Sequence, residues 1–191
     1  MTARRGLLIV ISGPSGVGKD TLIRRLLESD GKLRYSVSYT TRQPRAGEVD
    51  GVNYHFVSRD AFEKLIKEGA FIEHATYDGN LYGTPLAPLD RVRDAGHDIV
   101  LKIDVQGAEQ VRRRAADALL IFLAPPSMQE LLRRRTERHS ESAEDMTARQ
   151  RIAQREMELA PHFQHVVVND DIERAAHEVL QIIQKAREAQ T

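Results

Sequence analysis

Four short apolar runs mark the places where the chain is predicted to form strands. They occupy residues 7–11, 99–103, 119–123 and 166–168 and consist mainly of valine, isoleucine and leucine. A strand without polar alternation is typical of a parallel sheet that is covered on both faces. Helical patterns separate the runs, so we expect an α/β protein with a central parallel sheet.

Amphipathic helices complete this predicted core. The first follows residue 18, carries leucine and isoleucine on one face, and ends near Asp30. The last covers residues 172–187, with Asp170 or Asp171 as its N-cap. Helices between the strands would give three layers, with the sheet in the middle.

Two segments differ in character from the rest of the chain. Residues 35–88 are rich in Gly, Tyr, Thr and Asn, alternate like antiparallel strands, and contain one helical pattern at 59–68. Residues 127–150 are dense in arginine, and two capping boxes there predict two helices. We therefore predict a single domain, 1–191, with an inserted mixed α/β subdomain at 35–88, a small helical lid at 127–150, and a core made of residues 1–34, 89–126 and 151–191.

Composition narrows the classes of function. The 28 basic residues balance the 28 acidic ones, which disfavours binding to the backbone of a nucleic acid. No apolar stretch approaches the ~20 residues of a membrane span. Cysteine is absent, which rules out disulfides and thiolate metal sites and fits a reducing compartment, so we expect a cytoplasmic protein that binds neither nucleic acid nor membrane.

A phosphate-binding loop follows the first apolar run. The run Gly13-Pro14-Ser15-Gly16-Val17-Gly18-Lys19 matches the pattern G-x-x-x-x-G-K between a buried strand and an amphipathic helix. Its backbone N–H groups can surround phosphate oxygens, and Lys19 adds a positive charge. The core is thus predicted to be a P-loop NTPase fold that binds ATP; the alternative is a glycine turn with a solvated lysine.

Asp20 departs from the usual loop pattern. Serine or threonine ordinarily follows the lysine and reaches Mg²⁺, whereas here Asp20 follows it and Thr21 comes next. A carboxylate is a good ligand for Mg²⁺, so Asp20 is a candidate metal ligand. The alternative is that Asp20 is only a residue of the first helical turn, where the helix dipole favours a negative charge.

A second group of residues suits a phosphate acceptor. Arg42 and Arg45 end a predicted strand, Pro44 stiffens the segment, and Tyr54 follows. Two guanidinium groups and a hydroxyl can bind a phosphate monoester dianion. From spacing alone, solvated arginines at a strand end explain the pattern as well.

The acceptor residues belong to longer motifs. The run Ser38-x-Thr40-Thr41-Arg42-x-Pro44-Arg45-x-Gly47-Glu48, then Gly51-x-x-Tyr54-x-Phe56, resembles the signature of the guanylate kinase family. Four further segments match in order and spacing, so the resemblance covers nearly the whole chain: Phe71-Ile-Glu73, Gly79-Asn-x-Tyr-Gly-Thr84, Ile103-Asp-Val-Gln-Gly107 and Val168-Asn-Asp-Asp171.

The resemblance implies ATP-dependent phosphorylation of GMP, and of dGMP, in purine nucleotide metabolism. It makes residues 35–88 the GMP-binding subdomain. The GMP-binding positions that it implies are Ser38, Arg42, Arg45, Glu48, Tyr54, Glu73, Tyr82, Thr84 and Asp104. Of these, Ser38, Glu73 and Thr84 would recognise guanine, and four would hold its phosphate: Arg42, Arg45, Tyr54 and Tyr82.

The same resemblance implies an ATP site and a catalytic set. Besides residues 13–21, Asn169 would lie beside adenine. The catalytic positions would be Lys19, Arg42, Arg134, Arg138 and Arg149, with Mg²⁺ as cofactor. The neighbouring run from Arg112 to Arg114 is expected to be a solvated helix face.

Three further positions depart from the family pattern. Lys102 stands where many relatives have an acid, and strand alternation predicts a salt bridge from Lys102 to Asp104. Glu137 and His139 replace glycines beside the middle lid arginine.

Two alternative functions stay open: a sister kinase for a phosphorylated sugar, and a non-catalytic scaffold of the same fold. The sequence leaves the oligomeric state open.

Overall fold

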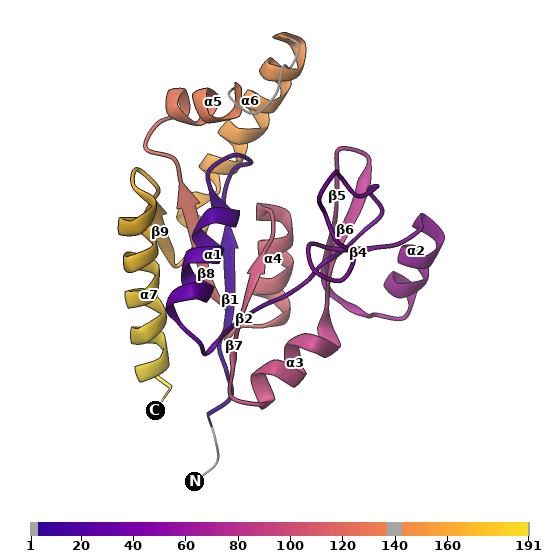
Figure 1. The fold of residues 1–191 in the computed structure, drawn as a ribbon, viewed down its shortest axis with the longest axis vertical. Helices are drawn as coiled ribbons and strands as arrows, with labels where there is room; N and C mark the ends of the chain where they lie inside the picture. Colours follow the sequence, from indigo (N-terminus) through magenta and orange to yellow (C-terminus); the bar gives the residue numbers. More distant parts are fainter. Residues whose placement is uncertain (1–3, 137–142, 191) are drawn as a thin grey trace.

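The computed structural model describes residues 4–136 and 143–190, and describes the side chains there except those of 135–136 and 143–149. Figure 1 shows a layered core with α5 and α6 beyond the carboxyl ends of its strands and a second, smaller sheet to the side. Both ends of the described chain lie near the amino ends of these strands.

The central sheet has five strands in the order β2-β7-β1-β8-β9, and every pairing is parallel. Four strands confirm the apolar runs within a residue or two. The fifth, β2, is a three-residue edge strand that the sequence pattern did not predict. The strands are β1 (Leu8–Ser12), β2 (Leu33–Tyr35), β7 (Asp98–Lys102), β8 (Leu119–Ala124) and β9 (His165–Val168).

Helices cover both faces of this sheet, which confirms the three-layer α/β/α core. Ile9 and Ile11 of β1 pack with α1 (Lys19–Ser29) and α7 (Ile172–Glu188). The alternate residues Leu8 and Val10 pack with α3 (Leu86–Asp94) and α4 (Val105–Arg114). Asp171 is the N-cap of α7, since its side chain accepts from the Arg174 N–H.

The chain between β8 and β9 forms α5 (Met128–Thr136), α6 (Ala143–Glu158) and the short 3₁₀ helix η1 (Ala160–His162). Ser127 caps α5 as predicted, because its hydroxyl accepts from the Glu130 N–H at 3.1 Å. The second predicted cap, Ser142, lies outside the described residues.

The smaller sheet has the order β4-β3-β6-β5. Its strands are β3 (Tyr39–Thr40), β4 (His55–Phe56), β5 (Phe71–Tyr77) and β6 (Asn80–Pro85), with α2 (Arg59–Lys67) between β4 and β5. The predicted antiparallel pairing is confirmed for β3–β6 and β5–β6. It is wrong for β3–β4, which are parallel because the long loop 41–54 returns the chain to the same end.

Helix α4 fastens the smaller sheet to the core. The Gln110 side chain donates to the His74 carbonyl at 2.7 Å and accepts from the His74 N–H at 3.2 Å. Arg114 donates to the carbonyls of Phe71 and Ile72, both at 2.9 Å. The prediction that Arg114 is solvated is therefore wrong, because the arginine satisfies carbonyls of β5; exposed Arg112 and Arg113 pair with Glu109.

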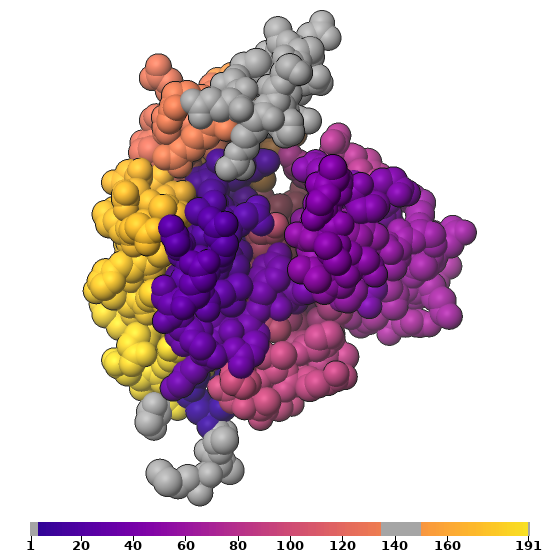
Figure 2. All heavy atoms as spheres, viewed as in Figure 1, coloured from indigo at the N-terminus to yellow at the C-terminus, as the bar shows by residue number. Residues whose placement is uncertain are grey.

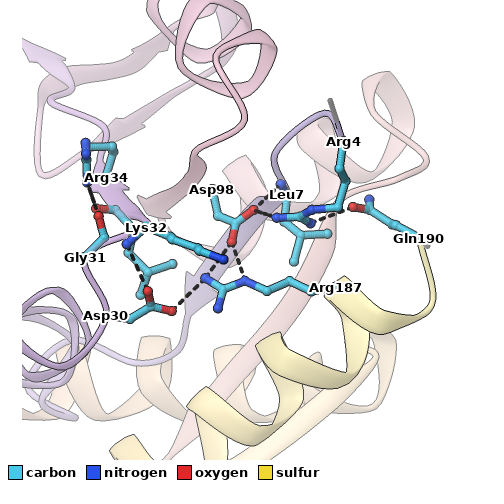
Figure 3. Close-up of polar contacts among 10 residues, drawn as sticks. Arg4, Leu7, Asp30, Gly31, Lys32, Arg34, Asp98, Arg187 and Gln190 are labelled. Carbon is cyan, nitrogen blue, oxygen red and sulfur yellow. Dashed lines mark hydrogen bonds and ion pairs between the residues drawn. The ribbon is translucent and has the colours of Figure 1, made fainter. Parts of the chain in front are cut away.

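A buried carboxylate joins four segments at the end of the central sheet where its strands begin (Figure 3). Asp98 is fully buried at the start of β7, and its Oδ1 accepts from Arg4 and from the Leu7 N–H, each at 2.7 Å. Its Oδ2 accepts from Arg187 of α7 at 2.7 Å, and Arg187 also pairs with Asp30 after α1.

We expect Asp98→Asn to lower the free energy of unfolding by about 3 kcal/mol, because it leaves partly buried arginines without their carboxylate. Urea denaturation followed by circular dichroism measures this loss. Asp90→Asn is the matched control, since the Asp90–Arg5 pair is about half exposed and should change stability by less than about 1 kcal/mol. Equal effects of the two variants would contradict the anchoring role of Asp98.

Candidate functional site

A cleft lies at the carboxyl end of β1 and β7, between the core and the smaller sheet, where the space-filling view shows the molecule hollowed (Figure 2). Fourteen predicted site residues line it: Gly13, Ser15, Gly16, Gly18, Lys19, Asp20, Thr21, Ser38, Arg42, Arg45, Tyr54, Glu73, Tyr82 and Asp104. The structure therefore brings the phosphate loop and the acceptor residues together. Lys102, which the sequence marked only as a departure from the family pattern, also lines the cleft. Four further lining residues were not predicted, namely Ala75, Tyr77, Ile103 and Glu156.

The phosphate loop connects β1 to α1 and needs glycine at both ends. Gly13 has φ 136°, and a Cβ there would overlap the Leu123 carbonyl of β8. Gly18 has φ 107° as the N-cap of α1, and a Cβ there would lie 2.5 Å from Nδ2 of Asn169. The backbone can take this turn close to its neighbours only without side chains.

Lys19 turns back onto the loop that precedes it. Its ammonium donates to the carbonyl of Gly13 and, at 3.0 Å, to that of Pro14. Burial lowers the pKa of Lys19 to about 8, although nearby Glu156 acts in the opposite direction. Loss of hydration thus leaves a cation at the centre of the loop that gains from an anionic ligand.

Asn169, the residue after β9, is hydrogen-bonded to the phosphate loop. Its side chain is buried and donates to the Val17 carbonyl at 2.7 Å, while its own backbone carbonyl accepts from Arg134 at 3.1 Å. Val17 points into the core, and neither Pro14, Val17 nor Asn169 lines the cleft. The expected place of Asn169 beside adenine stays a prediction.

The acceptor residues form a compact cationic and aromatic group. The Arg42 guanidinium lies 5.5 Å from the centroid of the Tyr54 ring, and the rings of Tyr54 and Tyr82 are 5.9 Å apart. Glu48 accepts from Arg42 at 2.8 Å and from the Arg45 N–H at 2.7 Å. The hydrogen bond from Arg42 lowers the pKa of Glu48. Glu48 is not among the residues that line this cleft, and it orients the arginine.

The polar set predicted for base recognition is buried on the smaller sheet. Glu73 of β5 faces Thr84 of β6 in register, and the Thr84 hydroxyl donates to the carboxylate of Glu73 at 2.5 Å. The Ser38 hydroxyl is 3.5 Å from that of Thr84. Glu73 is 3% exposed, and burial raises its pKa to about 7.

Helix α4 makes room for this carboxylate. Its N-cap Asp104 accepts from the Gly107 N–H at 2.8 Å. A Cβ on Gly107 would lie 2.6 Å from Oε2 of Glu73. The glycine therefore lets the core approach the carboxylate closely.

The predicted Lys102–Asp104 salt bridge is wrong. β7 ends at Lys102, so strand alternation does not extend to Asp104, whose side chain is used in capping α4. Lys102 pairs instead with Asp20 in the first turn of α1. Burial acts to lower the pKa of Lys102, but Tyr35, Tyr54 and Asp20 outweigh it and raise that pKa.

The arginine-rich segment is described only in part. Arg134 of α5 pairs with Glu130 at 2.8 Å and does not line the cleft. Arg138, Glu137 and His139 lie outside the described residues, and of Arg149 only the backbone, in α6, is described. Glu156 of α6 is 8% exposed and faces the phosphate loop; no motif in the sequence marked it.

The residues present are compatible with Mg²⁺. Residues 4–136 and 143–190 contain no group of three or more His, Cys, Asp or Glu side chains that could hold a metal ion. Mg²⁺ in kinases, however, is bound by one or two carboxylates together with substrate phosphates. Asp20, exposed at the mouth of the cleft beside Lys19, supplies a suitable oxygen, although Lys102 engages it in this structure. None of the described helices is long and apolar enough to cross a membrane.

Comparison with known proteins identifies the family. The family model described as guanylate kinase matches residues 5–186. The chain belongs to the guanylate kinase family. A guanylate kinase of Lactococcus lactis is 47% identical over 180 residues, covering 94% of this chain and 88% of that protein. One from Clostridium perfringens is 46% identical over 179 residues, covering 94% and 83%.

Solved structures agree with this family membership. The crystal structure of a guanylate kinase from Anaplasma phagocytophilum matches with a TM-score of 0.81 and 36% identity, over 97% of this chain and 88% of that one. A gluconokinase structure from Sinorhizobium meliloti matches with a TM-score of 0.51 and 16% identity, over 97% and 96%, which shows a shared fold alone.

We expect Glu73→Gln to stabilise the ligand-free protein at pH 8. The raised pKa of Glu73 means that the folded state binds its proton more tightly than the unfolded state, so stability falls as pH rises from about 4.5 through 7. Glutamine removes this loss, which is about 3 kcal/mol above pH 7. Thermal melting should show a higher Tm for the variant at pH 8 and equal values at pH 4.5; equal values at both would contradict the burial argument.

Proposed function

We propose that this chain transfers the γ-phosphoryl group of ATP to GMP, giving ADP and GDP. The observation that carries the proposal is one cleft that contains both a phosphate loop and the buried side chains of Ser38 and Glu73, with Thr84 hydrogen-bonded to Glu73. The loop alone supports binding of a nucleoside triphosphate. The buried carboxylate gives the second nucleotide its identity.

On the donor side, the loop and α1 hold the ATP phosphates. Backbone N–H groups at the helix N-terminus bind the phosphate oxygens, and Lys19 moves from the loop carbonyls to the phosphates. We propose that Arg134, Arg138 and Arg149, in a lid of residues 127–150, complete the neutralisation of the transferring group. Asn169 keeps the loop in shape through its bond to Val17.

On the acceptor side, Arg42, Arg45, Tyr54 and Tyr82 hold the GMP phosphate. Glu48 orients Arg42, so the guanidinium reaches the cleft already positioned. An oxygen of the acceptor phosphate attacks the γ-phosphorus in line, and the bond from phosphorus to the β,γ-bridging oxygen breaks. That attacking oxygen is already anionic near neutral pH, so no general base is required; catalysis rests on alignment and charge.

Guanine recognition follows from the buried polar set. An ionised Glu73 accepts from guanine N1–H and the 2-amino group. The Ser38 hydroxyl donates to O6, and the Thr84 hydroxyl turns from Glu73 to donate to O6 as well. Adenine lacks those two donors, so it would leave a buried carboxylate unpaired.

Several finer points are part of the same proposal. Asp20 would ligand Mg²⁺ where the usual hydroxyl is absent, and Asp104 would lie near the metal-bound phosphates. Residues 35–88 would act as the GMP-binding subdomain against a core of 1–34, 89–126 and 151–191. Turnover of dGMP, a role in purine nucleotide metabolism and a cytoplasmic location stay predictions.

The two alternatives meet opposing observations. A non-catalytic scaffold does not require an intact loop, yet Gly13, Gly18 and Lys19 are present in loop geometry. A sugar-phosphate kinase gives no reason for burying Glu73 against Thr84. Calorimetry with ATP separates the scaffold from both kinases.

We expect GMP to be the preferred acceptor in an assay coupled to ADP release. IMP lacks the 2-amino donor, and losing one hydrogen bond to a charged group should lower kcat/KM roughly 10- to 100-fold. AMP should be poorer still, and ribose bisphosphate inactive. If AMP or the sugar outcompetes GMP, the proposed acceptor is wrong.

We expect Lys19→Met and Arg42→Met each to lower kcat by roughly 100-fold or more, because each removes a charge aimed at a phosphate. Lys64→Met and Arg91→Met are controls, since both side chains are exposed outside the cleft. Circular dichroism should show all four variants folded. Near-normal turnover of the first pair would contradict the assigned roles.

A further inference from the structure

Lys102 lies where the two halves of the cleft meet. It is the last residue of β7 and pairs in register with Ile11 of β1. The phosphate loop begins after the next residue of β1, where that strand ends. It lines the same cleft as Lys19 and Arg42.

The contacts of Lys102 span both halves. Its ammonium is bonded to Asp20 of α1, next to Lys19. It also lies 5.7 Å from the centroid of the Tyr54 ring, which belongs to the acceptor group. The cation therefore stands between the phosphate loop and the acceptor arginines.

Stability gives little reason for this placement. The Lys102 side chain is 18% exposed, whereas its partner Asp20 is 81% exposed. An ion pair with so exposed a member contributes little to folding, while burying an ammonium is costly. A carboxylate that reaches in from the rim thus keeps a cation inside a cleft where phosphates are proposed to bind.

We infer that Lys102 is a further phosphate-binding residue, which donates to the acceptor phosphate while Asp20 positions its ammonium. The inference rests on the proposed function. An ammonium has three donors, so the bond to Asp20 leaves donors for a phosphate oxygen. The charge of Arg42 is partly neutralised by Glu48, so a phosphate dianion gains from this additional cation.

The test compares GMP with guanosine, which has the same base and no phosphate. Calorimetry should show that Lys102→Met weakens GMP binding roughly 10- to 100-fold, as expected for one charge-assisted hydrogen bond. Guanosine binding should not change. Lys67→Met, an exposed lysine of α2, is the matched control and should bind both ligands normally.

Three further variants sharpen the test. Lys102→Arg should restore most of the GMP affinity, and Lys102→Gln should repeat the loss if the methionine variant does not fold. Asp20→Asn should weaken GMP binding less than Lys102→Met does, because the ammonium remains but loses the carboxylate that positions it. Thermal melting establishes folding in each case.

The outcomes separate this inference from the proposed function. Normal GMP binding by Lys102→Met, beside an active wild-type enzyme, overturns the inference alone. So does an equal loss for guanosine and GMP, or a loss in Asp20→Asn as large as that in Lys102→Met, since each would indicate a structural brace. A wild-type chain that does not phosphorylate GMP overturns both.

Discussion

The register between β1 and β7, fixed at the amino ends of these strands, sets the positions of the residues at their carboxyl ends. Asp98 accepts from the Leu7 N–H and from arginines near both chain ends, so β1 and β7 start level with each other, beside the last turn of α7. Parallel strands that start level also end level. For this reason the phosphate loop after β1 and Lys102 at the end of β7 emerge side by side, in the place where open α/β sheets bind ligands.

Buried charged groups have opposite surroundings at the amino and carboxyl ends of the central strands. Asp98 is surrounded by donors, which makes it an anchor. Glu73 and Lys19 are also buried, yet their pKa values move toward the neutral forms, because the folded protein alone satisfies them incompletely. The cleft thus keeps part of its polar bonding capacity for nucleotides, and a ligand that supplies it is bound selectively.

Local patterns allowed much of this structure to be predicted. Unbroken apolar runs predicted four strands, and the phosphate loop and the twin-arginine segment predicted ten of the residues that line the cleft. The family resemblance added four more lining residues, which are Ser38, Glu73, Tyr82 and Asp104. What failed depends on contacts between distant positions. Lys102 and Asp20 are 82 residues apart, and Arg114 reaches β5 from α4. β2 is too short to carry a periodic signal, and Glu156 reaches the cleft only because α6 packs over it.

The fastening of β5 by α4 has a further consequence. β5 is an edge strand of the smaller sheet, and an edge strand presents backbone groups that can pair with another chain. Gln110 occupies both backbone groups of His74, and Arg114 occupies two carbonyls further along. Gln110 and Arg114, which hold β5 and its Glu73 against the core, therefore also block this edge against pairing with another chain. This protects β5 from aggregation through intermolecular β-sheet formation.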